Sequence, residues 1–365
     1  MKPHDYLKKN LRQNILSLPE PHPSIYYTDQ VEGEDIFLNR SEAFFPPSPK
    51  VVEVLSAHTN LANRYPDSAC TVLRHKLAQY VETGITPEHI IIGNGSDGLI
   101  ELLVKTFVNP QEEVIIPAPS FFVYVHATQL MGGTLVEGGR TGASEGFEID
   151  TAAVLEGVTD DTRLIFLANP NNPTGNTIDR TKIETILREV SCMVVVDECY
   201  YEVSGETVLD LVETYGNLII LRSLSKGFGL AGVRVGYCIS NRAVIGYLNR
   251  ADQTFPVNRF ALVAAETALE DLAYRDACIA ELKSQRTALA NALSTLGFHV
   301  YPSAANFLLV NWGQTLGTNP VAQLQEARVF VADFHSKPGL ENCFRTAVGN
   351  SVENQTFVEA LSKIS

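Results

Sequence analysis

The stretch Ser223-Leu224-Ser225-Lys226-Gly227-Phe228-Gly229-Leu230-Ala231-Gly232-Val233-Arg234 lies between two short apolar runs, residues 218–221 and 235–239, which are typical of buried strands. Connections between strands commonly carry chemistry on a rigid scaffold. Lys226 is the residue type that forms a Schiff base with a carbonyl group. The phosphate-binding residue types in the stretch are Ser223, Ser225 and Arg234. Taken alone, the stretch favours a solvated surface lysine, so other parts of the chain must show whether Lys226 has a chemical role.

The composition predicts a globular protein of two domains in the cytoplasm. A chain of 365 residues is too long for one simple core, and 45% hydrophobic with 19% charged residues is ordinary for a globular protein. The net charge of −14 argues against nucleic acid as a partner, and no apolar run approaches the roughly 20 residues that span a bilayer. The polar N-terminus does not resemble a signal peptide. Six cysteines without metal-ligand spacing indicate reduced thiols and no metal site.

The pattern of the chain predicts its domain organisation. Apolar runs, turns and helical patterns alternate over residues 36–257, which predicts a large α/β domain with a mostly parallel sheet. Residues 258–365 combine long helical runs with short strands, which predicts a smaller α+β domain. The proline-rich residues 1–35 are expected to form an extended arm, and the N-terminal segment is expected to join the smaller domain. Ligands of such parallel sheets bind at the carboxyl ends of the strands.

The turn Gly93-Asn94-Gly95-Ser96-Asp97-Gly98 lies at one of these strand ends. It follows a β-branched run and precedes a helical pattern. Backbone N–H groups at Ser96 and Asp97, together with the positive end of the helix dipole, therefore form a candidate phosphate site. An ordinary capped turn is the alternative.

Further polar residues follow other predicted strands. Asp197 ends a run of three valines, where a carboxylate needs a cationic partner, and a helix cap or an ion pair is the alternative role. Such a carboxylate can keep the pyridine nitrogen of pyridoxal phosphate protonated. Tyr200 and Asn172 can bind the phenolic oxygen of this ring, and Phe121 can stack on it, although an aromatic residue at that position is more often part of a core. Together with Lys226, these residues predict pyridoxal phosphate as the cofactor.

The order of these motifs resembles the fold type I pyridoxal-phosphate aminotransferases, and most of all the histidinol-phosphate aminotransferase family. The resemblance covers residues 37–361. It is carried by Arg64-Tyr65-Pro66-Asp67, Gly93-Asn94-Gly95-Ser96-Asp97, Pro119-Ser120-Phe121, Asn169-Pro170-Asn171-Asn172-Pro173-Thr174-Gly175, Asp197-Glu198-Cys199-Tyr200, the lysine stretch, Ser303-Ala304-Ala305-Asn306-Phe307 and Phe344-Arg345-Thr346-Ala347-Val348-Gly349.

The resemblance implies a homodimeric aminotransferase of amino-acid biosynthesis with active sites shared between subunits. The catalytic residues that it implies are Lys226, Asp197, Tyr200 and Asn172. The cofactor-binding residues that it implies are Tyr65, Ser96, Asp97, Phe121, Asn172, Asp197, Tyr200, Ser223, Ser225, Lys226 and Arg234. Tyr65 is expected to reach the phosphate in the neighbouring subunit, and Arg345 is expected to bind the acidic group of the substrate.

The chain departs from the family pattern at the substrate end. Family members carry an arginine before the aspartate that matches Asp333, whereas this chain has Ala332. Losing one guanidinium contact to an anion costs about 1.5–3 kcal/mol. Histidinol phosphate with 2-oxoglutarate is the leading substrate pair, and an aromatic or other amino acid is the alternative donor. Arg40 and Arg259 are candidates to replace the missing charge.

Two other classes of function also fit this scaffold. Threonine-phosphate decarboxylases share the scaffold and much of the C-terminal pattern, so a decarboxylation is one alternative. A regulatory protein built on a retired aminotransferase fold is the other. A competent residue stands at every cofactor-contacting position, which argues against the second.

Overall fold

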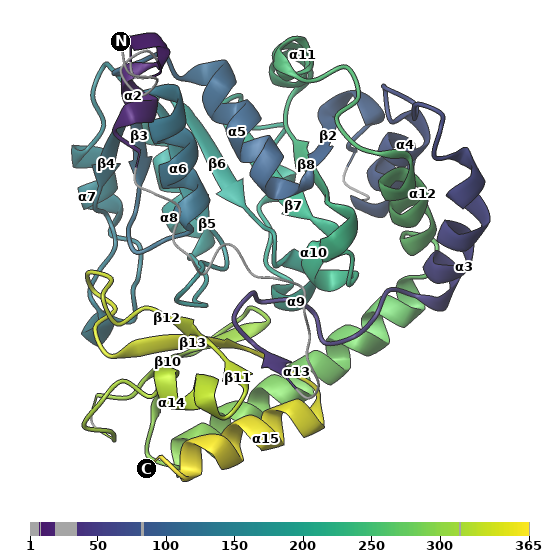
Figure 1. Cartoon of the computed structure of the whole chain (residues 1–365). Coiled ribbons are helices and arrows are strands. Elements are labelled where there is room, and N and C mark those ends of the chain that lie inside the picture. Colours follow the sequence, from purple (N-terminus) through teal and green to yellow (C-terminus); the bar gives the residue numbers. More distant parts are fainter. Residues whose placement is uncertain (1–6, 8, 19–34, 82–83, 314, 365) are drawn as a thin grey trace.

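The computed structural model describes residues 7, 9–18, 35–81, 84–313 and 315–364, and Figure 1 shows the arrangement of their helices and strands. The elements form a larger body around a seven-stranded sheet and a smaller body around a four-stranded sheet. Within the described residues, no helix is both long and apolar enough to cross a membrane.

The seven-stranded sheet has the order β2-β8-β7-β6-β5-β3-β4, and only β8 runs antiparallel to the other strands. Its strands are β2 (Ile90–Asn94), β3 (Glu113–Ile116), β4 (Thr134–Glu137), β5 (Thr162–Ala168), β6 (Met193–Asp197), β7 (Leu218–Ser223) and β8 (Val235–Ile239). Every residue of β7 is buried, as are the last four residues of β6. Strands that are covered on both faces read as continuous apolar runs, which explains why they stand out in the sequence. The predicted α/β fold with a mostly parallel sheet is confirmed.

Helices cover both faces of this sheet. Side chains of α5 (Gly95–Phe107), α6 (Phe122–Met131) and α11 (Arg242–Ala251) share one apolar core with the sheet. On the other face, the core includes α3 (Pro49–His58), α4 (Thr71–Val81), α7 (Thr151–Glu156), α8 (Arg180–Glu189) and α12 (Arg259–Ala268). Successive residues of β6 alternate between the two cores, since Val195 belongs to the first and Val194 and Val196 to the second.

The smaller body contains an antiparallel sheet of order β12-β13-β10-β9. These strands are β9 (His299–Val300), β10 (Phe307–Asn311), β12 (Ala332–Asp333) and β13 (Cys343–Ala347). The helices of this part are α13 (Leu272–Thr295), α14 (Val321–Glu326) and α15 (Ser351–Ser362). The N-terminal strand β1 (Ile36–Phe37) pairs in parallel with β11 (Val329–Phe330). The long helix α13 runs from the larger body along the smaller one (Figure 1).

The structure differs from the sequence expectations in two places. Part of the expected extended arm is a short helix, α2 (Gln13–Leu16), and Asn14 Nδ2 donates to the carbonyls of Leu130 (2.6 Å) and Gln129 (3.1 Å) in α6. The proline-rich part of the arm, residues 19–34, lies outside the described residues. Strand β13 was not expected. The domain boundary near residue 257 stays a proposal, and the packing of α12 in the core of the larger body favours a later position, before α13.

Candidate active site

Lys226 lies on a helix of one turn, α10 (Leu224–Gly227), directly after β7. Ser223 caps this turn, because its hydroxyl accepts a hydrogen bond from the amide of Ser225 at 3.2 Å. The sequence predicted an irregular connection here, and the helix is therefore a correction. Lys226 Nζ donates to the carbonyl of Ser41 at 2.9 Å. Burial, with a smaller contribution from the charge of Arg345, lowers the pKa of Lys226 to about 8, which increases the neutral, nucleophilic fraction near neutral pH.

Asp197 lies at the end of β6, next to β7 in the sheet, and is 6% exposed. Its carboxylate accepts hydrogen bonds from the hydroxyl of Tyr124 and from the amide of Cys199, the latter at 2.9 Å. Burial raises the pKa of Asp197, while these donors act in the opposite direction. Tyr124 was missed in the sequence, where it reads as one more apolar residue of α6; its ring stacks on Phe166 with centroids 4.5 Å apart.

Asn172 and Tyr200, which the sequence placed in one site, are adjacent in the structure. Asn172 Nδ2 lies 3.5 Å from the hydroxyl of Tyr200. The other side of the Asn172 amide accepts a hydrogen bond from the guanidinium of Arg345. Burial raises the pKa of Tyr200, so its hydroxyl stays protonated and remains a hydrogen-bond donor. The ring of Tyr200 packs edge-on against Phe307 at 5.4 Å.

The predicted phosphate-binding residues also lie together. Helix α5 begins at Gly95, whose φ of 70° favours glycine, and a Cβ atom there would lie 2.5 Å from Nη2 of Arg234. Arg234 Nη2 donates to Asp97 at 2.7 Å. The hydroxyls of Ser223 and Ser225 are 3.0 Å apart. Two hydroxyls, a guanidinium and the N-terminus of a 13-residue helix therefore form one polar corner at the edge of the sheet.

Phe121 and Tyr65 have different surroundings. Phe121 directly precedes α6, and its ring packs edge-on against Tyr124 at 5.6 Å, close to Asp197. Tyr65 is 78% exposed and stacks on Phe255 at 4.5 Å. Arg259 donates to the carbonyl of Tyr65 at 2.6 Å. The structure thus places Phe121 beside the site, whereas the described contacts of Tyr65 involve none of the other predicted site residues.

Arg345 lies in β13 and is 8% exposed. Its guanidinium donates to the carbonyl of Asn39 at 2.8 Å and lies over the ring of Phe307 at 5.2 Å. Ala332 is directly opposite Arg345 in the β12–β13 pair.

Several buried polar atoms near Arg345 and Lys226 lack a hydrogen-bond partner among the described residues. They are Asn39 Oδ1, Ser41 Oγ, Asn306 Oδ1 and Arg345 Nε. Asn306 Nδ2 donates to the carbonyl of Ser41 at 2.9 Å, which links these groups to Lys226. Unsatisfied buried polar groups are uncommon and call for an explanation. A bound group with both donors and acceptors fits this corner, so the residues present suit a polar, anionic ligand next to a lysine.

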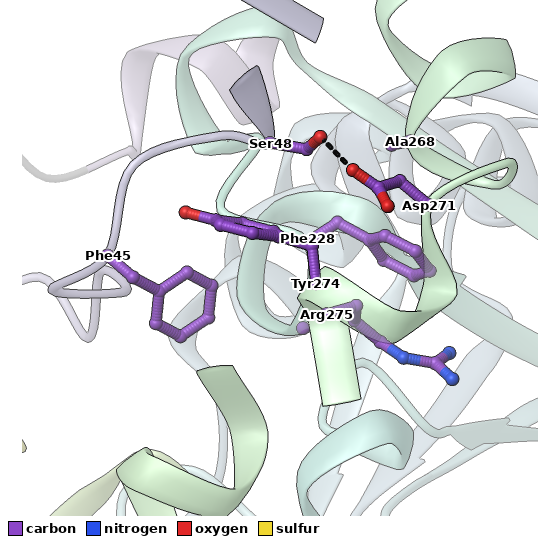
Figure 2. A pocket seen from close by; sticks show the side chains of 8 residues that line it. Phe45, Ser48, Phe228, Ala268, Asp271, Tyr274 and Arg275 are labelled. Atoms are coloured by element: carbon purple, nitrogen blue, oxygen red, sulfur yellow. Dashed lines mark hydrogen bonds between the residues drawn. The ribbon is translucent and has the colours of Figure 1, made fainter. Parts of the chain in front are cut away.

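A small pocket lies beside Gly227 at the end of α10, and Figure 2 shows side chains that line it. Gly227, Phe228 and Arg275 line it, together with Phe45, Ser48, Ala268, Asp271 and Tyr274. The hydroxyl of Ser48 donates to Asp271 at its rim (Figure 2). None of the predicted site residues lines this pocket, so it is separate from the site that faces Asp197.

The architecture around the lysine is that of the fold type I enzymes that depend on pyridoxal phosphate. Histidinol-phosphate aminotransferase from Sinorhizobium meliloti, solved in complex with pyridoxal-5'-phosphate, is similar with a TM-score of 0.87 over 97% of each chain at 24% identity. Aspartate aminotransferase from Thermus thermophilus, solved with maleate, is similar with a TM-score of 0.80 over 91% of this chain and 92% of its own at 23% identity. At these identities, the likeness establishes the fold.

The chain belongs to the family of class I and II aminotransferases, whose sequence model matches residues 36–361. Histidinol-phosphate aminotransferase from Roseiflexus castenholzii is 38% identical over 338 residues, which are 90% of each chain. The protein of that name from Methanocaldococcus jannaschii is 34% identical over 92% of this chain and 90% of its own. The expectation of a pyridoxal-phosphate-dependent aminotransferase is confirmed.

Proposed function

We propose that the protein transfers the amino group of histidinol phosphate to a 2-oxo acid, with 2-oxoglutarate as the acceptor. The similarity to histidinol-phosphate aminotransferases over nine-tenths of the chain carries this proposal. The buried arginine beside the lysine site supports it, because the donor substrate brings an anionic group there.

The geometry of the site supports the cofactor roles in this proposal. Pyridoxal phosphate, when bound, supplies an electron sink for the carbon that carries the amino group. Lys226 would hold the cofactor through Nζ and would move the proton at the reacting carbon, for which a lowered pKa suits an amine. Asp197 holds the pyridine nitrogen, with its carboxylate fixed by Tyr124. Asn172 and Tyr200 bind the phenolic oxygen of the ring, and Phe121 packs beside it.

The phosphate of the cofactor is assigned to the polar corner at the start of α5. The residues that hold it are the backbone N–H groups of Ser96 and Asp97, the hydroxyls of Ser223 and Ser225, and the guanidinium of Arg234. The N-terminus of a helix favours an anion, and hydroxyl and guanidinium donors complete the cradle. In this assignment, the guanidinium of Arg234, which donates to Asp97, would also donate to the phosphate.

Arg345 binds the anionic end of the substrate, where Asn172 and Asn39 hold its guanidinium in place. Ala332 favours a second candidate function, transamination of an aromatic or other amino acid. Ala332 faces Arg345 across the strand pair, so the position that carries a second arginine in the resembling family adds no charge here. A carboxylate needs one guanidinium, whereas a phosphate dianion gains from two.

The protein is further proposed to act as a homodimer in the cytoplasm. The exposed, stacked pair of Tyr65 and Phe255 supports a shared site, since Tyr65 is free to contact a second subunit. The six cysteines are free thiols, which fits a reducing compartment.

A panel of amino donors with 2-oxoglutarate tests the proposed function. Each donor is mixed with the cofactor-loaded protein, and conversion of the cofactor to its amine form is followed by absorbance. The proposal predicts that histidinol phosphate reacts with the highest kcat/KM. A higher value for an aromatic amino acid would select the second candidate. Carbon dioxide release from an amino-acid phosphate without any need for a 2-oxo acid would select the decarboxylase alternative.

A further inference from the structure

The helix that carries Lys226 is too short to hold its own shape. α10 has four residues, and one isolated helical turn is unfavourable because nucleation fixes several dihedral angles for few hydrogen bonds. The position of Lys226 therefore depends on the groups that pack against α10.

Glu202 forms the closest part of this support. It belongs to the short helix α9 (Tyr201–Ser204), which packs on α10. A Cβ atom on Gly227, the residue after Lys226, would lie 2.5 Å from Cβ, 2.7 Å from Cγ and 3.0 Å from Oε2 of Glu202. The side chain of Glu202 thus occupies the space beside the backbone of Gly227, and only glycine allows so close an approach.

The carboxylate of Glu202 is itself held by a chain of hydrogen bonds. Tyr80, on α4, donates its hydroxyl to Glu202 at 3.2 Å, and Arg275, on α13, donates to the same hydroxyl oxygen at 2.7 Å. The Arg275 guanidinium also lies over the ring of Phe228 at 5.3 Å, and the ring of Tyr80 packs edge-on against Phe228 at 5.9 Å. Glu202, Tyr80 and Arg275 therefore contact Gly227 and Phe228, the two residues that follow Lys226.

A small pocket also lies beside Phe228. It is the pocket of Figure 2, with Gly227, Phe228 and Arg275 in its wall. Side chains beside a void lose contacts on that side and can shift toward it. Glu202 and Tyr80 do not line the pocket, and their contacts with Gly227 and Phe228 therefore support α10 where it is densely packed.

We propose that Glu202 is a positioning residue for Lys226 and that Tyr80 and Arg275 fix Glu202 for this purpose. Glu202 acts through the backbone of Gly227 and does not touch the reacting groups. The inference rests on the proposed role of Lys226 as the cofactor-binding amine.

The test compares Glu202→Ala, which removes the carboxylate, with Glu202→Gln, which keeps the size and an acceptor for Tyr80. Tyr80→Phe removes only the bridging hydroxyl, and Tyr301→Phe is the control, a buried tyrosine in a separate apolar cluster. The first readout is the pH dependence of chemical modification of Lys226 in the full-length, cofactor-free protein, followed by peptide mass spectrometry. The second is kcat and KM of the loaded enzyme.

Glu202→Ala and Tyr80→Phe should move the midpoint of Lys226 modification upward by about one pH unit, because a displaced Lys226 is less buried. They should lower kcat about tenfold to a hundredfold with little change in KM, as expected when a reacting group is misplaced. Glu202→Gln and Tyr301→Phe should stay close to wild type. If Glu202→Ala does not fold, Tyr80→Phe decides.

Unchanged midpoints and kcat in Tyr80→Phe and in folded Glu202→Ala would overturn the inference, and so would an equal effect of Tyr301→Phe. If Lys226 does not bind the cofactor, the result is different, because wild-type protein would then show no imine absorbance after the cofactor is added.

Discussion

Restoring an arginine opposite Arg345 is predicted to strengthen binding of phosphate-bearing donors. Ala332 is partly buried and pairs directly with Arg345. Opposed residues of an antiparallel pair have Cβ atoms about 4.5–5.5 Å apart on the same face. The side chain introduced by Ala332→Arg therefore starts beside Arg345 and can bind the same anion.

The size of this effect follows from one added charge-assisted contact. Such a contact contributes about 1.5–3 kcal/mol, which is about tenfold to a hundredfold in affinity. A dianion also relieves the repulsion between the two guanidinium groups, whereas a carboxylate does so less. We expect KM for histidinol phosphate to fall by at least about tenfold and KM for phenylalanine to change much less.

Steady-state kinetics with both donors measure this difference. Ala332→Met is the matched control, because it adds a long side chain without a charge, and it should not lower KM for either donor. An unchanged KM for histidinol phosphate in a folded Ala332→Arg protein would refute the reasoning that the anionic group of the donor lies beside Arg345.

Three further predictions concern buried groups. Arg222→Met leaves the fully buried Glu198 without its cation and should lower the free energy of unfolding by about 3–5 kcal/mol. The double variant that also carries Glu198→Gln should recover most of this loss. Equal destabilisation of the single and the double variant in chemical denaturation would contradict this prediction. Tyr124→Phe removes a hydrogen-bond donor from Asp197, so the pKa of Asp197 should rise further. Equilibrium dialysis should then show cofactor affinity about tenfold lower, with a larger loss at acid than at alkaline pH. A pH-independent affinity equal to that of wild type would argue against a link between Tyr124 and the charge of Asp197. Because the pKa of Lys226 is lowered to about 8, its modification in cofactor-free protein should rise through pH 8, and a rise only near 10.5 would be inconsistent with a buried amine.

The sequence was informative where local pattern and burial coincide. Strands such as β6 are covered on both faces, so they appear as β-branched apolar runs whose ends can be located. Because parallel strands end at one edge of a sheet, residues 172, 197, 200 and 226 could be assigned to one site before their distances were known. Sheet topology brings these residues together, and the alternation of strand and helix patterns in the sequence predicts that topology.

Other parts of the site depend on contacts that no local pattern contains. β13 mixes Arg345 and Thr346 with apolar residues, yet both are buried, and the hydrogen-bond partners of Arg345 are Asn39 and Asn172, far away along the chain. The bond between Tyr124 and Asp197 joins residues 73 positions apart. The short helix α10 packs against α9, which carries Glu202, whereas Gly227 and Gly229 suggest a loop. Sequence periodicity does not predict any of these three features.

The central claim, that Lys226 is the amine that binds the cofactor, has one direct test. Purified protein is loaded with pyridoxal phosphate and reduced with borohydride, and the modified residue is located by peptide mass spectrometry. The structure predicts the pyridoxyl group on Lys226 and its loss in Lys226→Ala. A modification on another lysine, or an unchanged yield in Lys226→Ala, would contradict the account.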